Sequence, residues 1–339
     1  MPKKKKPTYQ RGRKTRYKKP TLNHKRLSMV VLGLLVVAGL IAVAGTAINA
    51  TGTQSNNALN RTLNQTVLAA QVIPQNGYTL PFKWGDVVHK LVETGALNVS
   101  NLLIILNNSG QPLTPVEKEI LNGTYDGYIR FNSANTEFSQ LVLWALGINN
   151  NNTIINNGPI INASTQYADQ INSNAASNQK VTVGYIASNY FASTGGYAPV
   201  GSLQLGGLDL INLTSQQQAL MYDVATHSYR PCCDNPTAFP DCNHGAAALG
   251  LVELLASQNA NQTQMFSAIK YFYQYQFPQQ YIKIAAYFDL HGENYSQVNP
   301  SEVMSYGFSS YTGFSNVNQY LVKSGGLPQP SGTGAACGA

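Results

Sequence analysis

Charged side chains are scarce in this chain of 339 residues, at 11%, and the motifs of several common enzyme classes are missing. It contains no Walker phosphate loop, no dinucleotide-binding fingerprint and no Ser-His-Asp arrangement, so neither a nucleotide-dependent enzyme nor a serine hydrolase is indicated. Cysteine occurs only four times. The paired C-x-x-C of zinc ribbons and the C-x-x-C-H of covalent haem are absent, so neither of those sites is predicted. The sequence supports no hydrolase or oxidoreductase assignment.

Acidic residues are absent from residues 1–26, which contain 12 Lys or Arg. The rest of the chain holds 22 − 12 = 10 basic and 15 acidic residues, so a tail of net charge +12 precedes a remainder of −5. A basic run of this kind indicates either nucleic-acid binding or a cytoplasmic flank that orients a membrane segment. The next segment favours the second interpretation.

Residues 27–48 form a run of 22 residues without a charge, rich in Leu, Val and Ala. A helix of that length spans roughly 30 Å of hydrocarbon. We expect one transmembrane helix in the cell membrane, with residues 1–26 in the cytoplasm and the main domain extracytoplasmic, and no nucleic-acid partner. A cleaved signal peptide is the alternative, because small residues near Ala44 and Ala50 offer cleavage points.

The exported part is rich in Asn-x-Ser/Thr sequons, which predict a glycosylated surface protein. Eleven are present, at Asn49, Asn60, Asn64, Asn98, Asn107, Asn122, Asn151, Asn162, Asn212, Asn261 and Asn294.

Patterning predicts a mainly α fold with a few short strands and a C-terminal antiparallel helical bundle. Residues 49–76 are a polar stalk or linker. Residues 77–212 form a mixed α/β region that contains an Asn-rich loop at 149–178. Residues 213–323 form the helical domain, and residues 324–339 are a flexible Gly/Pro/Ser tail that carries Cys337.

Several elements have specific signals. Thr114-Pro115-Val116-Glu117 matches a capping box and predicts a short helix. Tyr125–Phe131 and Lys180–Ser188 are predicted strands, and Glu253, within an apolar helix, is a candidate buried acid. Helices are predicted at 215–229, 243–258, 263–276 and 279–291.

Residues 229–245 read Y-R-P-C-C-D-N-P-T-A-F-P-D-C-N-H-G and contain the only concentration of soft ligands. Cys242 and His244, with Cys232 and Cys233, can bind a transition metal such as zinc, copper or iron. His227, on the preceding helix, and Cys337 are candidates to complete the site.

Two other chemistries fit the same residues. Four exported cysteines can form two disulfides in three connectivities, of which a bridge between adjacent Cys232 and Cys233 is the most strained. A reactive thiol beside His227 or His244 is the other alternative.

The stretch C-C-D-N-P-T-A-F-P-D-C-N-H-G-A-A-A-L-G-L-V-E-L, with F-A-S-T-G-G-Y, L-V-L-W-A-L-G and a C-terminal Cys-Gly, resembles a family of exported bacterial and archaeal proteins to which no activity is attached. The resemblance covers roughly residues 80–339. It implies that the cysteines and His244 belong to one recurring unit, and it transfers no catalytic role.

Two functional hypotheses follow. The first is a membrane-anchored extracytoplasmic protein that binds a transition metal for metal handling or redox chemistry. The second is a non-catalytic, glycosylated cell-surface protein, stapled by disulfides and placed in a larger assembly.

Overall fold

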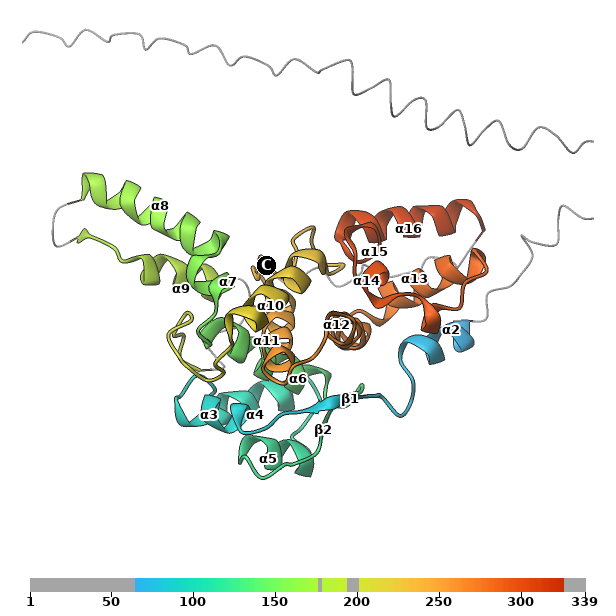
Figure 1. The fold of residues 1–339 in the computed structure, drawn as a ribbon, viewed down its shortest axis with the longest axis horizontal. Coiled ribbons are helices and arrows are strands. Elements are labelled where there is room, and N and C mark those ends of the chain that lie inside the picture. The colour runs from blue at the N-terminus through green and yellow to red at the C-terminus, as the bar shows by residue number, and fades with distance from the viewer. Residues whose placement is uncertain (1–64, 176–178, 194–200, 326–339) are drawn as a thin grey trace, which may run out of the picture. The chain divides into compact units, whose positions relative to one another are not determined.

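The computed structural model describes residues 65–175, 179–193 and 201–325 (Figure 1). The predicted basic tail, the membrane segment at 27–48 and Cys337 lie outside these residues. Within them, no helix combines the length and the apolar character needed to cross a membrane. The part of the predicted stalk that is described contains a short helix, α2 (Gln65–Val72).

The C-terminal half is helical, as predicted. Thr214 and Asn261 begin two of its helices with capping boxes, and Pro278 occupies the first turn of a third. At each of these signals a new helix begins, in a direction that differs from that of the preceding segment. The elements are α10 (Ser215–His227), α11 (Asn243–Ser257), α12 (Gln262–Gln276), α13 (Pro278–Leu290), η2 (Tyr295–Gln297), α14 (Pro300–Val303), α15 (Tyr306–Ser309) and α16 (Tyr311–Lys323).

The N-terminal half contains a two-stranded antiparallel sheet, formed by β1 (Tyr78–Lys83) and β2 (Tyr128–Phe131). The second strand confirms most of the prediction for residues 125–131. The predicted capping box at Thr114 is present, with both reciprocal hydrogen bonds. The helices here are α3 (Val87–Glu93), α4 (Val99–Asn108), α5 (Pro115–Leu121) and α6 (Thr136–Asn149).

Two predictions between residues 149 and 193 are wrong. The expected Asn-rich loop contains helices α7 (Thr153–Asn157) and α8 (Pro159–Asn174). Ile160, Ser164 and Ala168 of α8 are all buried, and their spacing of four places them on one helix face. The expected strand at 180–188 is largely helix α9 (Val183–Ser193), whose start is capped by the Thr182 hydroxyl.

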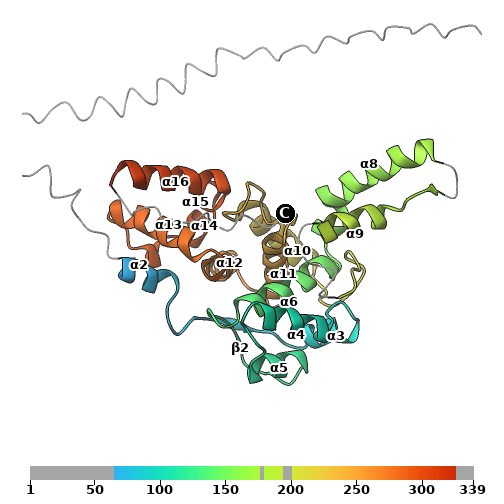
Figure 2. The same cartoon turned by 180° about the vertical axis from the view of Figure 1, so that it is seen from behind.

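Helices α6 and α11 lie side by side at the centre of the described fold (Figures 1 and 2). Gly147 of α6 faces the backbone of α11, and Gly250 of α11 faces the backbone of α6. A methyl group at either position would overlap a backbone carbonyl, so only glycine permits this separation. Residues 245–256 of α11 are all buried, which fixes the start of α11 against the core.

Candidate metal centre

The loop between α10 and α11 carries the Cys/His motif, and backbone hydrogen bonds fold it back on itself. Thr237 N–H donates to the Ser228 carbonyl at 2.8 Å, and Tyr229 pairs with Pro236 in an antiparallel bridge. Ala238 N–H also donates to the Ala225 carbonyl at 2.9 Å. The loop therefore has a defined shape although it contains neither a helix nor a strand.

The Arg230 side chain lies inside this loop and stabilises it through hydrogen bonds. Its guanidinium group is fully buried and donates to the carbonyl oxygens of Asn235 and Pro236, each at 3.0 Å. It also donates to the Phe239 carbonyl at 3.1 Å and forms an ion pair with Asp241. The planar guanidinium has five N–H donors, which a lysine ammonium could not replace.

Gly245, in the first turn of α11, leaves the space that the guanidinium occupies, because a side-chain carbon there would lie 2.7 Å from the Arg230 guanidinium carbon. The Arg230 Nε–H points to Cys242 and donates to its Sγ at 3.1 Å. Arg230 thus connects the loop directly to the cysteine that begins α11.

Cys232, Cys242 and His244 converge. One ligand atom from each lies within 4.8 Å of the others, and all three side chains are partly buried. Cys242 is the N-cap residue of α11, and His244 lies in its first turn. Cys232 comes from the other end of the loop, so the fold of the loop is what assembles the group.

The separation of the two sulfurs fits a metal ion. Two thiolates bound to one tetrahedral zinc ion at about 2.3 Å lie about 3.8 Å apart. The observed distance between Cys232 Sγ and Cys242 Sγ is 4.0 Å. A disulfide requires about 2.05 Å. The three cysteines that the structure describes form no disulfide.

A second group overlaps the first. Cys233, Asp241 and Cys242 also each offer a ligand atom within 4.8 Å of the others. Asp241 is already engaged, since one carboxylate oxygen accepts from Arg230 and the other from Asn235 Nδ2 at 2.6 Å. The two groups share only Cys242, and in the described chain no single group contains both Cys233 and His244.

The electrostatic environment keeps a positive charge beside the sulfurs. Burial alone would lower the pKa of Arg230, but the neighbouring Cys242, Tyr273, Cys233 and Asp241 raise it well above its ordinary value. Burial raises the pKa of Asp241, and Arg230 opposes that effect. A fixed guanidinium charge stabilises negative charge on Cys242 in any thiolate complex.

The His244 ring packs against Phe277 with their centroids 4.5 Å apart, and its backbone carbonyl accepts a hydrogen bond from Tyr273 at 3.2 Å. Glu137 of α6 is close enough to His244 for the two side chains to interact electrostatically. Burial raises the pKa of the Glu137 carboxyl, and His244 opposes that rise. Phe277, at the junction of α12 and α13, therefore restricts where the imidazole can move.

The structure separates His227 from the cluster. Its side chain is 69% exposed at the end of α10, and its Nδ1 lies 2.8 Å from the Asp223 carbonyl oxygen. Neither group of convergent ligands in the described chain includes it. Neither Arg230 nor Asp241 was predicted from the sequence to take part in the site. The Arg-Pro pair before two cysteines was the available signal for their role.

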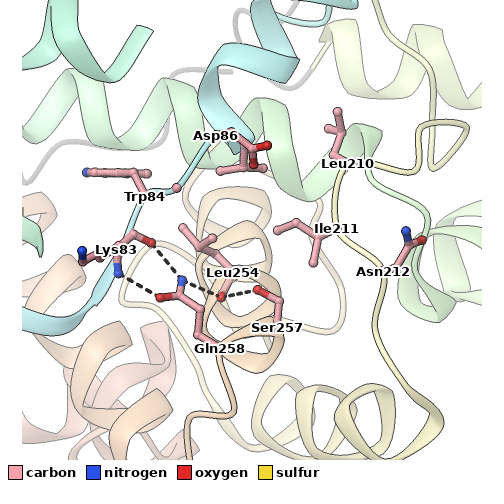
Figure 3. A pocket seen from close by; sticks show the side chains of 11 residues that line it. Lys83, Trp84, Asp86, Leu210, Ile211, Asn212, Leu254, Ser257 and Gln258 are labelled. Atoms are coloured by element: carbon pink, nitrogen blue, oxygen red, sulfur yellow. Dashed lines mark hydrogen bonds between the residues drawn. The ribbon is translucent and has the colours of Figure 1, made fainter. Parts of the chain in front are cut away.

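A separate hollow of about 420 Å³ lies between the end of β1 and the C-terminal end of α11 (Figure 3). Gln258 is one of the residues that line this hollow. Its amide accepts from Lys83 N–H at 2.9 Å and donates to the Lys83 carbonyl at 2.8 Å. Ser257 donates to the Leu254 carbonyl, and Asp86 pairs with Lys90. Because these polar groups are engaged with the protein, the hollow offers less chemistry than the cysteine cluster.

Comparisons with known proteins add no assignment, because the chain matches no protein-family model, no curated protein and no solved structure. The resemblance to an exported family stays a prediction.

Proposed function

We propose that this protein binds one transition-metal ion through Cys232, Cys242 and His244 and serves metal handling or redox chemistry. The observation that carries the proposal is the convergence of two sulfurs and an imidazole nitrogen within 4.8 Å. Two thiolates and one imidazole form a soft, mixed donor set that suits zinc, copper or iron.

Cys233 or a solvent molecule would provide the fourth ligand. Three protein ligands with an exchangeable fourth position allow a bound metal to react or to be passed on, whereas four protein ligands favour a structural role. The partial burial of Cys232, Cys242 and His244 supports the exchangeable arrangement.

The cellular location belongs to the same proposal. The basic residues 1–26 and the uncharged segment 27–48 support an anchor in the cell membrane, with residues 65–325 on the extracytoplasmic side. Glycosylation at the sequons and membership of a cell-surface assembly stay predictions.

Metal analysis of the full-length chain tests the proposal. Protein purified in mild detergent under reducing conditions and incubated with zinc should retain about one ion per chain after dialysis. Cys232→Ser, Cys242→Ser and His244→Gln should each lose stoichiometric zinc, because each removes a ligand.

His227→Gln is the matched control for His244→Gln. It removes an imidazole from the neighbouring helix, outside both ligand groups, and should retain zinc as the wild type does. A wild-type chain that holds no stoichiometric zinc, copper or iron while its thiols are reduced would refute the proposal. Peptide maps linking Cys337 to residues 232–242 would then support the disulfide-stapled alternative.

A further inference from the structure

The two sulfurs that fit a metal ion are also placed to react with each other. Cys232 Sγ and Cys242 Sγ lie 4.0 Å apart, about 2 Å farther than in a disulfide. Each cysteine reaches the other through a side chain that can rotate about χ1. A sulfur within a disulfide is no longer a thiolate ligand, so the metal-bound and bridged forms exclude each other.

The loop between the two cysteines is already closed by other contacts. Arg230 ties Asn235, Pro236 and Phe239 to the segment that precedes Cys232. Tyr311 N–H donates to the Cys233 carbonyl at 3.0 Å, which fixes the same end of the loop to the start of α16. Bridge formation therefore requires little further ordering of the folded backbone.

The opposite ends of the pair differ in freedom. Cys242 is the N-cap of a helix whose next residues pack into the core, whereas Cys232 lies in the loop. Because the backbone beside Cys232 is held as well, the smaller rearrangement turns the Cys232 side chain toward Cys242 and leaves both backbones in place. The fixed contact from Arg230 Nε to Cys242 Sγ is consistent with that direction of movement.

We propose that Cys232 and Cys242 form a reversible dithiol–disulfide couple that exchanges with small-molecule disulfides and releases the bound metal when it is oxidised. This inference rests on the proposed function, because the release step requires that these sulfurs bind a metal.

The reaction consumes one small disulfide, R–S–S–R. The thiolate of one cysteine attacks a sulfur of R–S–S–R, which gives a mixed disulfide and expels one RS⁻. The second cysteine thiolate attacks the protein sulfur of that mixed disulfide, forms the Cys232–Cys242 bond and expels the second RS⁻. The two electrons lost by the cysteines reside on the two RS⁻ products, and the metal ion leaves as a free cation.

Because the metal-bound and disulfide forms exclude each other, the effect of zinc on the oxidation of the two cysteines can be calculated. Because only the dithiol form binds the ion, each tenfold rise in free zinc above its Kd should disfavour oxidation tenfold. For a two-electron couple, a tenfold change in the equilibrium constant corresponds to about 30 mV. The bridged chain should in turn bind no zinc at this site, because two of the three ligands are lost on oxidation.

The test equilibrates the full-length chain, in mild detergent, with defined mixtures of reduced and oxidised glutathione at several fixed zinc concentrations. Thiol alkylation followed by peptide mapping identifies which cysteines are bridged, and a chromogenic chelator measures zinc release. We expect a Cys232–Cys242 bridge, one zinc released per bridge, and a midpoint that shifts tenfold per tenfold change in zinc.

Cys233→Ser is the informative variant, because it removes the adjacent thiol and should still form the Cys232–Cys242 bridge. Cys232→Ser should form no bridge to Cys242. Zinc binding without any Cys232–Cys242 bridge at high oxidised glutathione would overturn this inference and leave the proposed function intact. A bridge that uses Cys233 or Cys337 instead of Cys232 would overturn it as well. A Cys232–Cys242 bridge in a chain that never binds zinc, copper or iron would overturn the proposed function and, with it, the release step.

Discussion

Replacing Glu253 by glutamine should stabilise the protein, and increasingly so as the pH rises. Glu253 is fully buried in α11, and Asn150 Nδ2 donates to its Oε1 at 3.4 Å. Its Oε2 has no hydrogen-bond partner among the residues that the structure describes. Burial raises the pKa of the carboxyl well above 4.5, although hydrogen bonds from Asn150 and Asn152 oppose the shift.

The sign of the pH dependence follows from proton binding. Above pH 4.5 the unfolded chain releases the Glu253 proton while the folded chain retains it, so the folded state binds more protons. Stability contributed by this group is complete below pH 4.5 and is lost as the pH rises toward the pKa of the folded state. The loss is about 1.4 kcal/mol per pH unit between pH 4.5 and the pKa of the folded state. Glutamine keeps the size of the side chain and has no proton to lose.

Urea unfolding of wild type and Glu253→Gln at pH 5, 6, 7 and 8 measures the effect. The difference in the free energy of unfolding should grow with pH in favour of Glu253→Gln, and other titrating groups cancel because both proteins share them. Glu119→Gln makes the same change on an exposed side chain of α5 and should stay within about 0.5 kcal/mol of wild type. A difference between wild type and Glu253→Gln that is constant from pH 5 to pH 8 would show that Glu253 is not a buried neutral acid.

Two further changes probe the packing that supports the cluster. Arg230→Met should lower the free energy of unfolding by about 3–5 kcal/mol, because it leaves Asp241 and three carbonyl groups without their donor. Arg230→Lys should lose less, and equal stability of Arg230→Met and wild type in urea would contradict this role. Gly147→Ala should cost at least about 2 kcal/mol because α11 backbone occupies the space, whereas Gly184→Ala, where an added methyl group would meet only the Thr182 hydroxyl at 4.0 Å, should be neutral. Equal thermal midpoints for the two alanine variants would contradict the close contact of α6 and α11.

Local signals in the sequence determined most of the helices. Capping residues at Thr114, Thr214 and Asn261, and the proline at 278, act within a few residues of chain, so their effects are readable without tertiary contacts. The same reasoning failed between residues 149 and 193. There, Asn156, Asn157 and Asn162 are exposed on α7 and α8, and a sparse buried stripe was enough for helix formation.

Some features of the candidate site could also be predicted from the sequence, whereas others depended on tertiary structure. The sequence by itself placed Cys232, Cys233, Cys242 and His244 close along the chain and indicated Glu253 as a candidate buried acid, which the structure confirms. It left metal and disulfide chemistry as equal alternatives, because spacing along a loop does not determine the distance between two sulfurs. Tertiary structure decided that distance, since the buried Arg230 shapes the loop and the packing of α11 on α6 fixes Cys242. It also excluded His227, whose helix ends with its imidazole directed to solvent.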